Sequence, residues 1–305
     1  MGSLIHRPRP ECFPCIVDVT HRALEKTGSS EETKFNVMRQ SVDILAKELD
    51  RGANLPAVST KIFRLISERT GNPDPFLEEK RLCNQISIPL SQEALSQVLA
   101  VEDEVERIRR AALVSIAGNT MDLGTSGHSF DLGNFQEEYE GIIDQGLAID
   151  DSEKLADILS TARSVLYLGD NAGEIAFDRV LVAAIHTISP RVTFAVKGGP
   201  ISNDATLADA EEVSMFDYAK VITTGTDHLG ISLDESSDEF LSEFESSDVI
   251  IAKGQSNLET ILYEAGRIRK LVAFVLRAKC RPIARVLGVG VGDNVLKVVD
   301  MSKQA

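Results

Sequence analysis

The segment Ser164-Val-Leu-Tyr-Leu-Gly-Asp-Asn-Ala-Gly-Glu174 joins a short apolar run to a polar turn. The run predicts a buried strand, and the turn follows at the C-terminal end of that strand, which is where open α/β sheets bind their ligands. Asp170 offers a carboxylate and Asn171 an amide carbonyl, both hard oxygen donors that suit Mg²⁺ or Mn²⁺. The segment therefore predicts an α/β fold with a ligand site at the edge of its sheet.

The same turn leads into a helix, which is expected from about Glu174 to Ile188. Gly173 would let the backbone approach a ligand, and the positive end of the helix dipole would attract an anion. A metal ion and a phosphate would both fit here. The pair Asp170 and Asn171 also has a plain alternative, because Asp and Asn form Asx turns and helix caps.

Residues 163–305 alternate short β-branched runs with helical windows. The six runs are 165–168, 192–196, 220–223, 249–252, 271–276 and 295–299. Such alternation is typical of a mostly parallel sheet with helices on both faces. We therefore expect a three-layer α/β/α domain over this part of the chain.

Residues 1–162 show helical periodicity instead, and they predict a helical N-terminal subdomain. Ser30 is the expected N-cap of a helix over 31–50, and Pro56 opens a second, shorter helix. A stripe of apolar residues through Val101, Val105 and Ile108 predicts a long helix that starts near Ser91.

Asp204 follows the strand expected over 192–196, after the turn Lys197-Gly-Gly-Pro200. In a parallel sheet it lies at the same edge as Asp170, and neighbouring strands are only about 4.8 Å apart, so the two loops could share one ion. The alternative is that Asn203 and Asp204 cap a helix that begins near Ala205.

Lys253 ends the apolar run Val249-Ile-Ile-Ala252, where a charge would be costly if the strand continued into the core. At the C-terminal end of the strand it can extend into a cleft, and Gly254 leaves room for a ligand. The polar residue Asn257 follows closely and favours a site. Lys197 holds the same position on its own strand and is a second candidate. A surface lysine is the ordinary alternative for either one.

The loop Thr223-Thr-Gly-Thr-Asp-His228 predicts a further wall of this cleft. Asp227 is the residue expected to contact the non-phosphate part of a substrate. His228 could titrate near neutral pH, although a loop histidine without a visible partner is more often simply exposed.

Four polar segments end predicted strands or helices: 118–124, 169–174, 197–204 and 248–259. Together they resemble the damage-control phosphatase family, a group of metal-dependent phosphatases, and the resemblance extends from Cys12 to about Cys280. It implies one divalent cation, Mn, Mg, Co or Ni, held by Asp170, Asn171 and Asp204. It further implies that Lys253 meets the substrate phosphate, while Asn119 and Asp122 line the same cleft.

The chemistry that this resemblance implies is hydrolysis of phosphate monoesters of small metabolites, such as sugar phosphates or damaged phosphometabolites. The cation would neutralise the phosphoryl oxygens and polarise an attacking water, while Lys253 and the helix N-terminus at Gly173 stabilise the transferring group. Glu174 is the candidate for orienting the water. Asp170 could instead attack phosphorus, but that chemistry usually shows Asp-x-Asp where this chain reads Asp-Asn, so water is the favoured nucleophile.

Two other functions stay open. A methyltransferase that uses S-adenosylmethionine and acts on carboxylates is suggested by earlier descriptions of eukaryotic members, but the turn after Leu168 lacks the G-x-G pattern of the usual doubly wound fold. A protein that binds a metal or a metabolite without turnover is the other alternative. Release of phosphate from a substrate panel would separate it from an enzyme.

The four cysteines suggest a second site. Cys12-Phe-Pro-Cys15 has the spacing of half a zinc or redox site, whereas Cys83 lies in a helical stretch without a CxxC partner. The resemblance is to the shorter prokaryotic branch of the family, and it implies a shared metal or redox site of Cys12, Cys15 and Cys280. Reduced, partly buried thiols are the alternative.

Composition sets the outer limits. The net charge of −15 argues against binding of nucleic acid, because such affinity comes from clustered Lys and Arg. No apolar stretch approaches the length of a membrane span, and residues 1–10 lack a signal-peptide core. We therefore expect a cytoplasmic protein whose partner is a small phosphorylated metabolite, with no nucleic-acid or membrane partner. The sequence does not indicate its oligomeric state.

Overall fold

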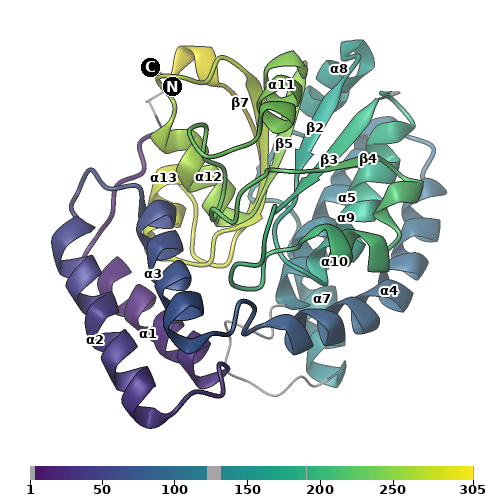
Figure 1. Cartoon of the computed structure of the whole chain (residues 1–305). Helices are drawn as coiled ribbons and strands as arrows, with labels where there is room; N and C mark the ends of the chain where they lie inside the picture. The colour runs from purple at the N-terminus through teal and green to yellow at the C-terminus, as the bar shows by residue number, and fades with distance from the viewer. Residues whose placement is uncertain (1–3, 122–131, 190, 305) are drawn as a thin grey trace.

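A single sheet forms the centre of the structure, a computed structural model that describes residues 4–121, 132–189 and 191–304 (Figure 1). Its seven strands lie in the order β1-β7-β6-β5-β2-β3-β4. They are β1 (Ile149–Asp150), β2 (Val165–Leu168), β3 (Val192–Val196), β4 (Lys220–Thr223), β5 (Val249–Lys253), β6 (Leu271–Arg277) and β7 (Asn294–Asp300). All neighbouring strands are parallel except β6 and β7. The expected α/β fold with a mostly parallel sheet is confirmed.

All six predicted runs are strands, as expected of β-branched stretches. Five of them are largely buried, whereas β4 lies at the edge of the sheet and is only partly buried. The sequence missed β1, whose two residues are too short to show a pattern. It also gave no sign that β7 runs antiparallel to β6, since both faces of β7 are largely buried and direction depends on the connection before it.

Helices cover both faces of the sheet and make the three expected layers. On one face, α4 (Leu77–Leu99), α5 (Glu104–Ala117) and α9 (Glu174–His186) share a core with β2 and β5. On the other face, α11 (Asp238–Ser246), α12 (Gly254–Tyr263) and α13 (Arg281–Leu287) pack on the alternate side chains of the same strands. Around them lie α7 (Leu132–Gln145), α8 (Ser152–Thr161) and α10 (Leu207–Glu212).

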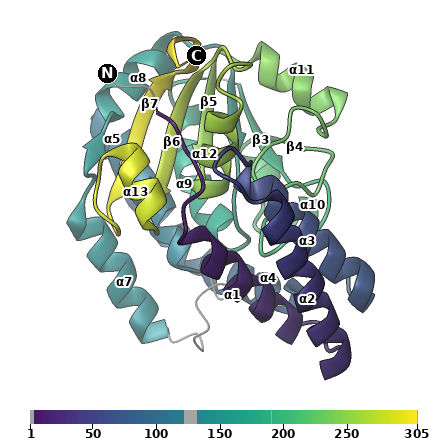
Figure 2. The same cartoon turned by 90° about the vertical axis from the view of Figure 1, so that its left-hand side faces the viewer.

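The three N-terminal helices form a separate group with its own apolar core. They are α1 (Cys12–Glu25), α2 (Glu31–Glu48) and α3 (Leu55–Thr70), and they stand together at one end of the sheet (Figure 2). Ser30 caps α2 as expected, because its side chain accepts a hydrogen bond from the Thr33 N–H. The apolar core of this group ends at Phe76. The helices α4 and α5, which fall within the expected subdomain of residues 1–162, pack against α9 and the sheet. The expected division at residue 162 stays a prediction.

The long helix expected from Ser91 is two helices. The helix α4 begins earlier, at Leu77, and contains Pro89, while α5 starts after Asp103. The Asp103 carboxylate accepts a hydrogen bond from the Glu106 N–H at 2.8 Å and so caps α5. The apolar stripe in the sequence continues across the break between α4 and α5, so it did not reveal the break. The capping residue Asp103 is the sequence signal that marks the start of α5.

The order of the strands places a crevice at the carboxyl ends of the neighbouring central strands β2 and β5. Along the sheet β3 and β4 lie on one side of β2, while β5 and β6 lie on the other. The loops after β2 and β5 therefore leave the sheet in opposite directions, and the crevice between them is where such folds bind ligands. No helix within the described ranges is long and apolar enough to cross a membrane.

Candidate functional site

A cavity of about 380 Å³ opens at this crevice, between the sheet edge and the helices α1 and α3. Its apolar wall includes Ile16, Ile62 and Phe63 from these helices. The predicted residues that line it are Asn119, Asp170, Asn171, Glu174, Asp204, Lys253, Cys12, Cys15 and Cys280. Asp122, the other predicted cleft residue, lies outside the described residues.

The loops after β2 and β3 are hydrogen-bonded to one another. Asn171 and Asp204 form an antiparallel bridge, flanked by the bonds from the Ala172 N–H to the Asn203 carbonyl and from the Ala205 N–H to the Asp170 carbonyl, both 2.9 Å. The helix after this loop, α10, is capped by Thr206 and Asp209 in a capping box. Asp204 is therefore free of the capping role that was its alternative.

Gly254 is required for Asp170 to enter the cavity. Its φ is +73°, and a Cβ atom built there would lie 1.9 Å from the Asp170 Oδ2 atom. Any other residue would therefore collide with the carboxylate. Gly254, the first residue after β5, thus leaves room for the side chain of Asp170 from the loop after β2.

The two carboxylates are buried close together and repel each other. Burial, with the neighbouring charges of Glu174 and Asp204, raises the pKa of Asp170 well above its usual value. Burial raises the pKa of Asp204 to about 6, although the Lys197 ammonium limits the rise. The Asp204 Oδ2 atom is buried and accepts no hydrogen bond, and the Lys197 Nζ atom lies 3.5 Å from it. Lys197 and Lys279 therefore offset the negative charge of these two acids only in part.

Asn171 completes an oxygen donor set with these two acids. Its Nδ2 atom donates to the Asp170 Oδ2 atom at 3.1 Å and to the Glu174 Oε2 atom at 2.9 Å. The carbonyl oxygen of the amide is therefore turned away from these two carboxylates. Two carboxylates and an amide oxygen suit a hard divalent cation, and a cation would remove the repulsion between the acids. The residues present fit the expected metal.

Glu174 is held by three side chains. Its Oε2 atom accepts hydrogen bonds from the amides of Asn171 and Asn119, and its Oε1 atom lies 3.0 Å from the Lys253 Nζ atom. The carboxylate is almost fully buried yet lines the cavity. Its orientation is therefore fixed, as the predicted role of orienting a water molecule would need.

Lys253 lines the cavity, and its side chain is fully buried. Its Nζ atom donates to the Ser115 carbonyl at 3.0 Å and lies 3.0 Å from Glu174 and 3.3 Å from Asp178. Burial alone would lower the pKa of Lys253, but the carboxylates of Asp178 and Glu174 outweigh it, so the pKa is raised. The ammonium thus donates one hydrogen bond to the Ser115 carbonyl and is ion-paired with the carboxylates of Glu174 and Asp178. The direct phosphate contact predicted for Lys253 would require it to leave one of them.

Three other predicted substrate residues make internal bonds instead. The Lys197 Nζ atom donates to the Gly230 carbonyl beside Asp204. The Gly173 N–H donates to the Asn84 Oδ1 atom at 2.7 Å, and Cys83 covers the position of a Cβ atom, so α4 closes the N-terminus of α9. Asn257 donates to the carbonyls of Lys253 and Gly169 at 2.8 and 3.2 Å.

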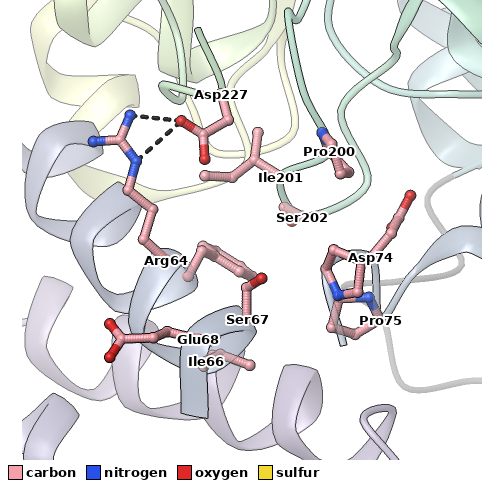
Figure 3. Close-up of a pocket in the computed structure, with 12 residues that line it drawn as sticks. Arg64, Ile66, Ser67, Glu68, Asp74, Pro75, Pro200, Ile201, Ser202 and Asp227 are labelled. Atoms are coloured by element: carbon pink, nitrogen blue, oxygen red, sulfur yellow. Dashed lines mark hydrogen bonds and ion pairs between the residues drawn. The ribbon is translucent and has the colours of Figure 1, made fainter. Parts of the chain in front are cut away.

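Asp227 lines a neighbouring pocket of about 200 Å³ rather than the main cavity. Figure 3 shows the Arg64 guanidinium from α3 against its carboxylate, with the Nε atom at 3.0 Å and the Nη2 atom at 2.5 Å from Oδ1. The same Nη2 atom lies 2.5 Å from Glu235. Asp227 thus ties the N-terminal helices to the loop after β4. Ser202 lines both pockets and lies between them.

Lys279 is a cavity residue that the sequence reasoning did not select. It follows β6, lines the cavity, and its positive charge acts on Asp170 against the effect of burial. Its backbone N–H donates to the Gln255 Oε1 atom at 2.9 Å, which joins the loops after β6 and β5. A signal was present, because Lys279 lies two residues after the end of β6, at the same end of the parallel strands as Lys253.

The cysteines Cys12, Cys15 and Cys280 line the cavity and are free thiols. Burial raises the pKa of Cys280 to about 11, and burial also raises those of Cys12 and Cys15. Across the described residues, no three His, Cys, Asp or Glu side chains are arranged to hold a metal ion. A preformed thiolate site is therefore absent there, and a second metal or redox site stays a prediction.

The repulsion at Asp204 predicts how the metal-free protein responds to substitution. A folded-state pKa of about 6, raised from 3.8, contributes stability at low pH that is lost as pH rises through this window. Asp204→Asn removes the ionisation, so the metal-free variant should be more stable than wild type by about 1–3 kcal/mol near pH 7.5, and the difference should shrink near pH 4.5.

Thermal unfolding in chelator at several pH values measures this difference. Asp234→Asn, which removes an exposed acid paired with Arg267, is the matched control and should not gain stability. Equal stability of wild type and Asp204→Asn at both pH values would contradict the assigned repulsion.

Comparisons with known proteins identify the family of this chain. A family model described as the damage-control phosphatase ARMT1-like domain matches residues 9–295. The chain is 34% identical to a damage-control phosphatase of Archaeoglobus fulgidus, over 95% of this chain and 99% of that one. It is 35% identical to a damage-control phosphatase of Pyrococcus horikoshii, over 93% and 96%. An uncharacterised protein of Methanocaldococcus jannaschii is 38% identical over 94% of both chains.

A solved structure shows the same fold. The crystal structure of a DUF89 family protein from Pyrococcus horikoshii superposes with a TM-score of 0.81 and 32% identity, and covers 95% of this chain and 98% of that one. Both the family model and these relatives span nearly the whole chain. The protein therefore belongs to the damage-control phosphatase family.

Proposed function

We propose that this protein is a metal-dependent phosphatase that hydrolyses phosphate monoesters of small metabolites. The observation that carries the proposal is the buried pair Asp170 and Asp204, two acids with raised pKa values that repel each other in a ligand-sized cavity. Isolated acids of this kind are costly in a protein interior unless a cation binds them. Membership of the family supplies the reaction class.

Asp170, Asn171 and Asp204 would hold the cation, with Mn, Mg, Co and Ni as the candidates. When bound, a divalent cation supplies charge neutralisation for phosphoryl oxygens and lowers the pKa of bound water. The backbone bridge between Asn171 and Asp204 holds together the two loops that carry these side chains. The site therefore does not need to rearrange its backbone to bind.

The residues of the chain divide the remaining work. Glu174, held by Asn119, Asn171 and Lys253, would orient the attacking water. Lys279 also lines the cavity, where its charge acts on Asp170, and would meet the substrate phosphate. Lys253 supplies a buried positive charge beside Glu174 and holds its carboxylate through their ion pair. The apolar residues of α1 and α3 would cover the rest of the metabolite and exclude water.

The geometry does not favour the methyltransferase alternative. Its cofactor would need open backbone at the turn after β2. The Gly173 N–H is instead bonded to Asn84, and Cys83 fills the space next to it. Turnover distinguishes the remaining alternative, a protein that binds a metabolite without acting on it.

Metal removal tests the proposal directly. Chelation should abolish phosphate release from a panel of phosphorylated metabolites, and added Mn²⁺, Mg²⁺, Co²⁺ or Ni²⁺ should restore it to different extents. Asp170→Asn should lose both the metal and the activity, because each carboxylate supplies charge that the cation needs. Asp234→Asn, remote from the cavity, is the control and should keep both. Full activity in chelator, or in Asp170→Asn, would refute the metal assignment.

The two cavity lysines should give different kinetic effects. Lys253→Met should lower kcat by about 100-fold or more, because Glu174 loses the partner that orients it. Lys253→Arg should rescue little, since a planar guanidinium cannot replace a compact ammonium among three buried acceptors. Lys279→Met should instead raise KM by about tenfold with a smaller change in kcat, and Lys279→Arg should restore most of it.

Steady-state kinetics with Mn²⁺ at saturation separates these effects, and thermal unfolding checks that each variant folds. Arg281→Met is the control for Lys279, because it removes the same charge two residues later, at the start of α13 and outside the cavity lining. Wild-type kcat in Lys253→Met would make that lysine purely structural. Wild-type KM in Lys279→Met would remove it from the substrate contacts.

A further inference from the structure

Beneath the cavity lies a second buried acid that the proposed chemistry does not use. Asp178 is one turn after Glu174 on α9, so the two carboxylates lie on the same face of the helix. Asp178 is fully buried and does not line the cavity. It cannot touch a substrate from there, yet it lies 3.3 Å from the Lys253 ammonium.

Two hydroxyl groups orient Asp178. Its Oδ1 atom accepts hydrogen bonds from the Tyr167 hydroxyl at 2.9 Å and from the Ser115 hydroxyl at 2.6 Å. Tyr167 lies on β2 and Ser115 on α5, and both are fully buried. These bonds fix the face of the carboxylate that meets Lys253. The Ser115 carbonyl also accepts a bond from the Lys253 Nζ atom, so one residue holds both partners.

The contacts of Lys253 connect Asp178 to the predicted metal ligand Asn171 through Glu174. Lys253 lies 3.0 Å from the Glu174 Oε1 atom, and the Oε2 atom of the same carboxylate accepts a hydrogen bond from Asn171. One unbroken series of buried contacts thus runs from Tyr167 through Asp178, Lys253 and Glu174 to Asn171. Apolar residues would fill this space at a lower desolvation cost than two carboxylates and an ammonium, which suggests a role beyond stability.

We infer that Asp178, oriented by Tyr167 and Ser115, is a positioning residue that fixes the Lys253 ammonium and, through it, the Glu174 carboxylate. This inference rests on the proposed function, because Glu174 is taken to orient the attacking water. Without Asp178, Lys253 would be free to shift toward its remaining acceptors, and Glu174 would lose its fixed orientation. Turnover should fall while binding is kept, since neither metal ligands nor substrate contacts are removed.

Two substitutions test the inference. Asp178→Asn keeps the shape of the side chain but removes its charge, and it should lower kcat by about 100-fold while KM and the dissociation constants of Mn²⁺ and inorganic phosphate stay within about threefold. Tyr167→Phe should lower kcat by about tenfold with the same constants kept. The double variant should be no worse than Asp178→Asn alone, because Tyr167 acts through Asp178.

Thr193→Val is the matched control. It removes a buried hydroxyl that donates to Glu243 from the neighbouring strand β3, away from the cavity lining. If buried polar groups here contribute only stability, Thr193→Val and Tyr167→Phe should both lower Tm and leave kcat unchanged. The inference requires that only Tyr167→Phe changes kcat. Tyr167→Phe also decides the question if Asp178→Asn fails to fold.

An NMR measurement does not depend on activity. In lysine-labelled protein, the Nζ resonance of Lys253, assigned with Lys253→Met, should be protected from exchange in wild type and shifted and less protected in Tyr167→Phe. The inference would be overturned if Asp178→Asn and Tyr167→Phe both kept the wild-type kcat and an unchanged Lys253 resonance. It would also be overturned if these variants lost metal and phosphate binding together with kcat. If wild type releases phosphate from no ester, the proposed function fails, and the resonance still reports whether Asp178 holds the ammonium.

Discussion

Lys253 places one positive charge among carboxylates that would otherwise repel one another inside the protein. Its ammonium meets Glu174, Asp178 and the Ser115 carbonyl, and all of these contacts are buried. A buried ion pair of this kind is weak evidence for stability, because desolvation offsets much of the attraction. It does fix geometry. The orientation of Glu174, and the amide of Asn171 bonded to it, both depend on where this one charge lies.

The cavity above this charge is left with more negative charge than its own lysines neutralise. Asp170 and Asp204 have raised pKa values although Lys197 and Lys279 act on them. The bridge between the loops after β2 and β3 prevents the two acids from moving apart. The fold thus holds its acids in an unfavourable arrangement, and a bound cation would recover that energy. This is the pattern expected of a preorganised ligand site.

The sequence predicted what depends on strand direction. Parallel strands end at one edge, so Asp170, Asp204 and Lys253 could be placed at the same cavity from their positions after apolar runs. It did not predict what depends on packing between distant helices. Asn84 on α4 accepts a hydrogen bond from the Gly173 N–H, and Arg64 on α3 pairs with Asp227. In both cases the two partners are far apart in the sequence. The packing of α4 and α5 in the core of the sheet was not predicted for the same reason.

The N-terminal helices give the site its closed form. The helices α1 and α3 provide the apolar wall, and the Arg64 guanidinium connects α3 to Asp227 and Glu235 beside the loop after β4. A second connection is the bond from the Leu229 N–H to the Thr60 hydroxyl, which is 3.0 Å and buried. An open crevice at a sheet edge would leave its charges in water, where their interactions are weak. Covered by these helices, the same charges act in a drier environment, and electrostatic stabilisation of a reacting phosphate becomes stronger.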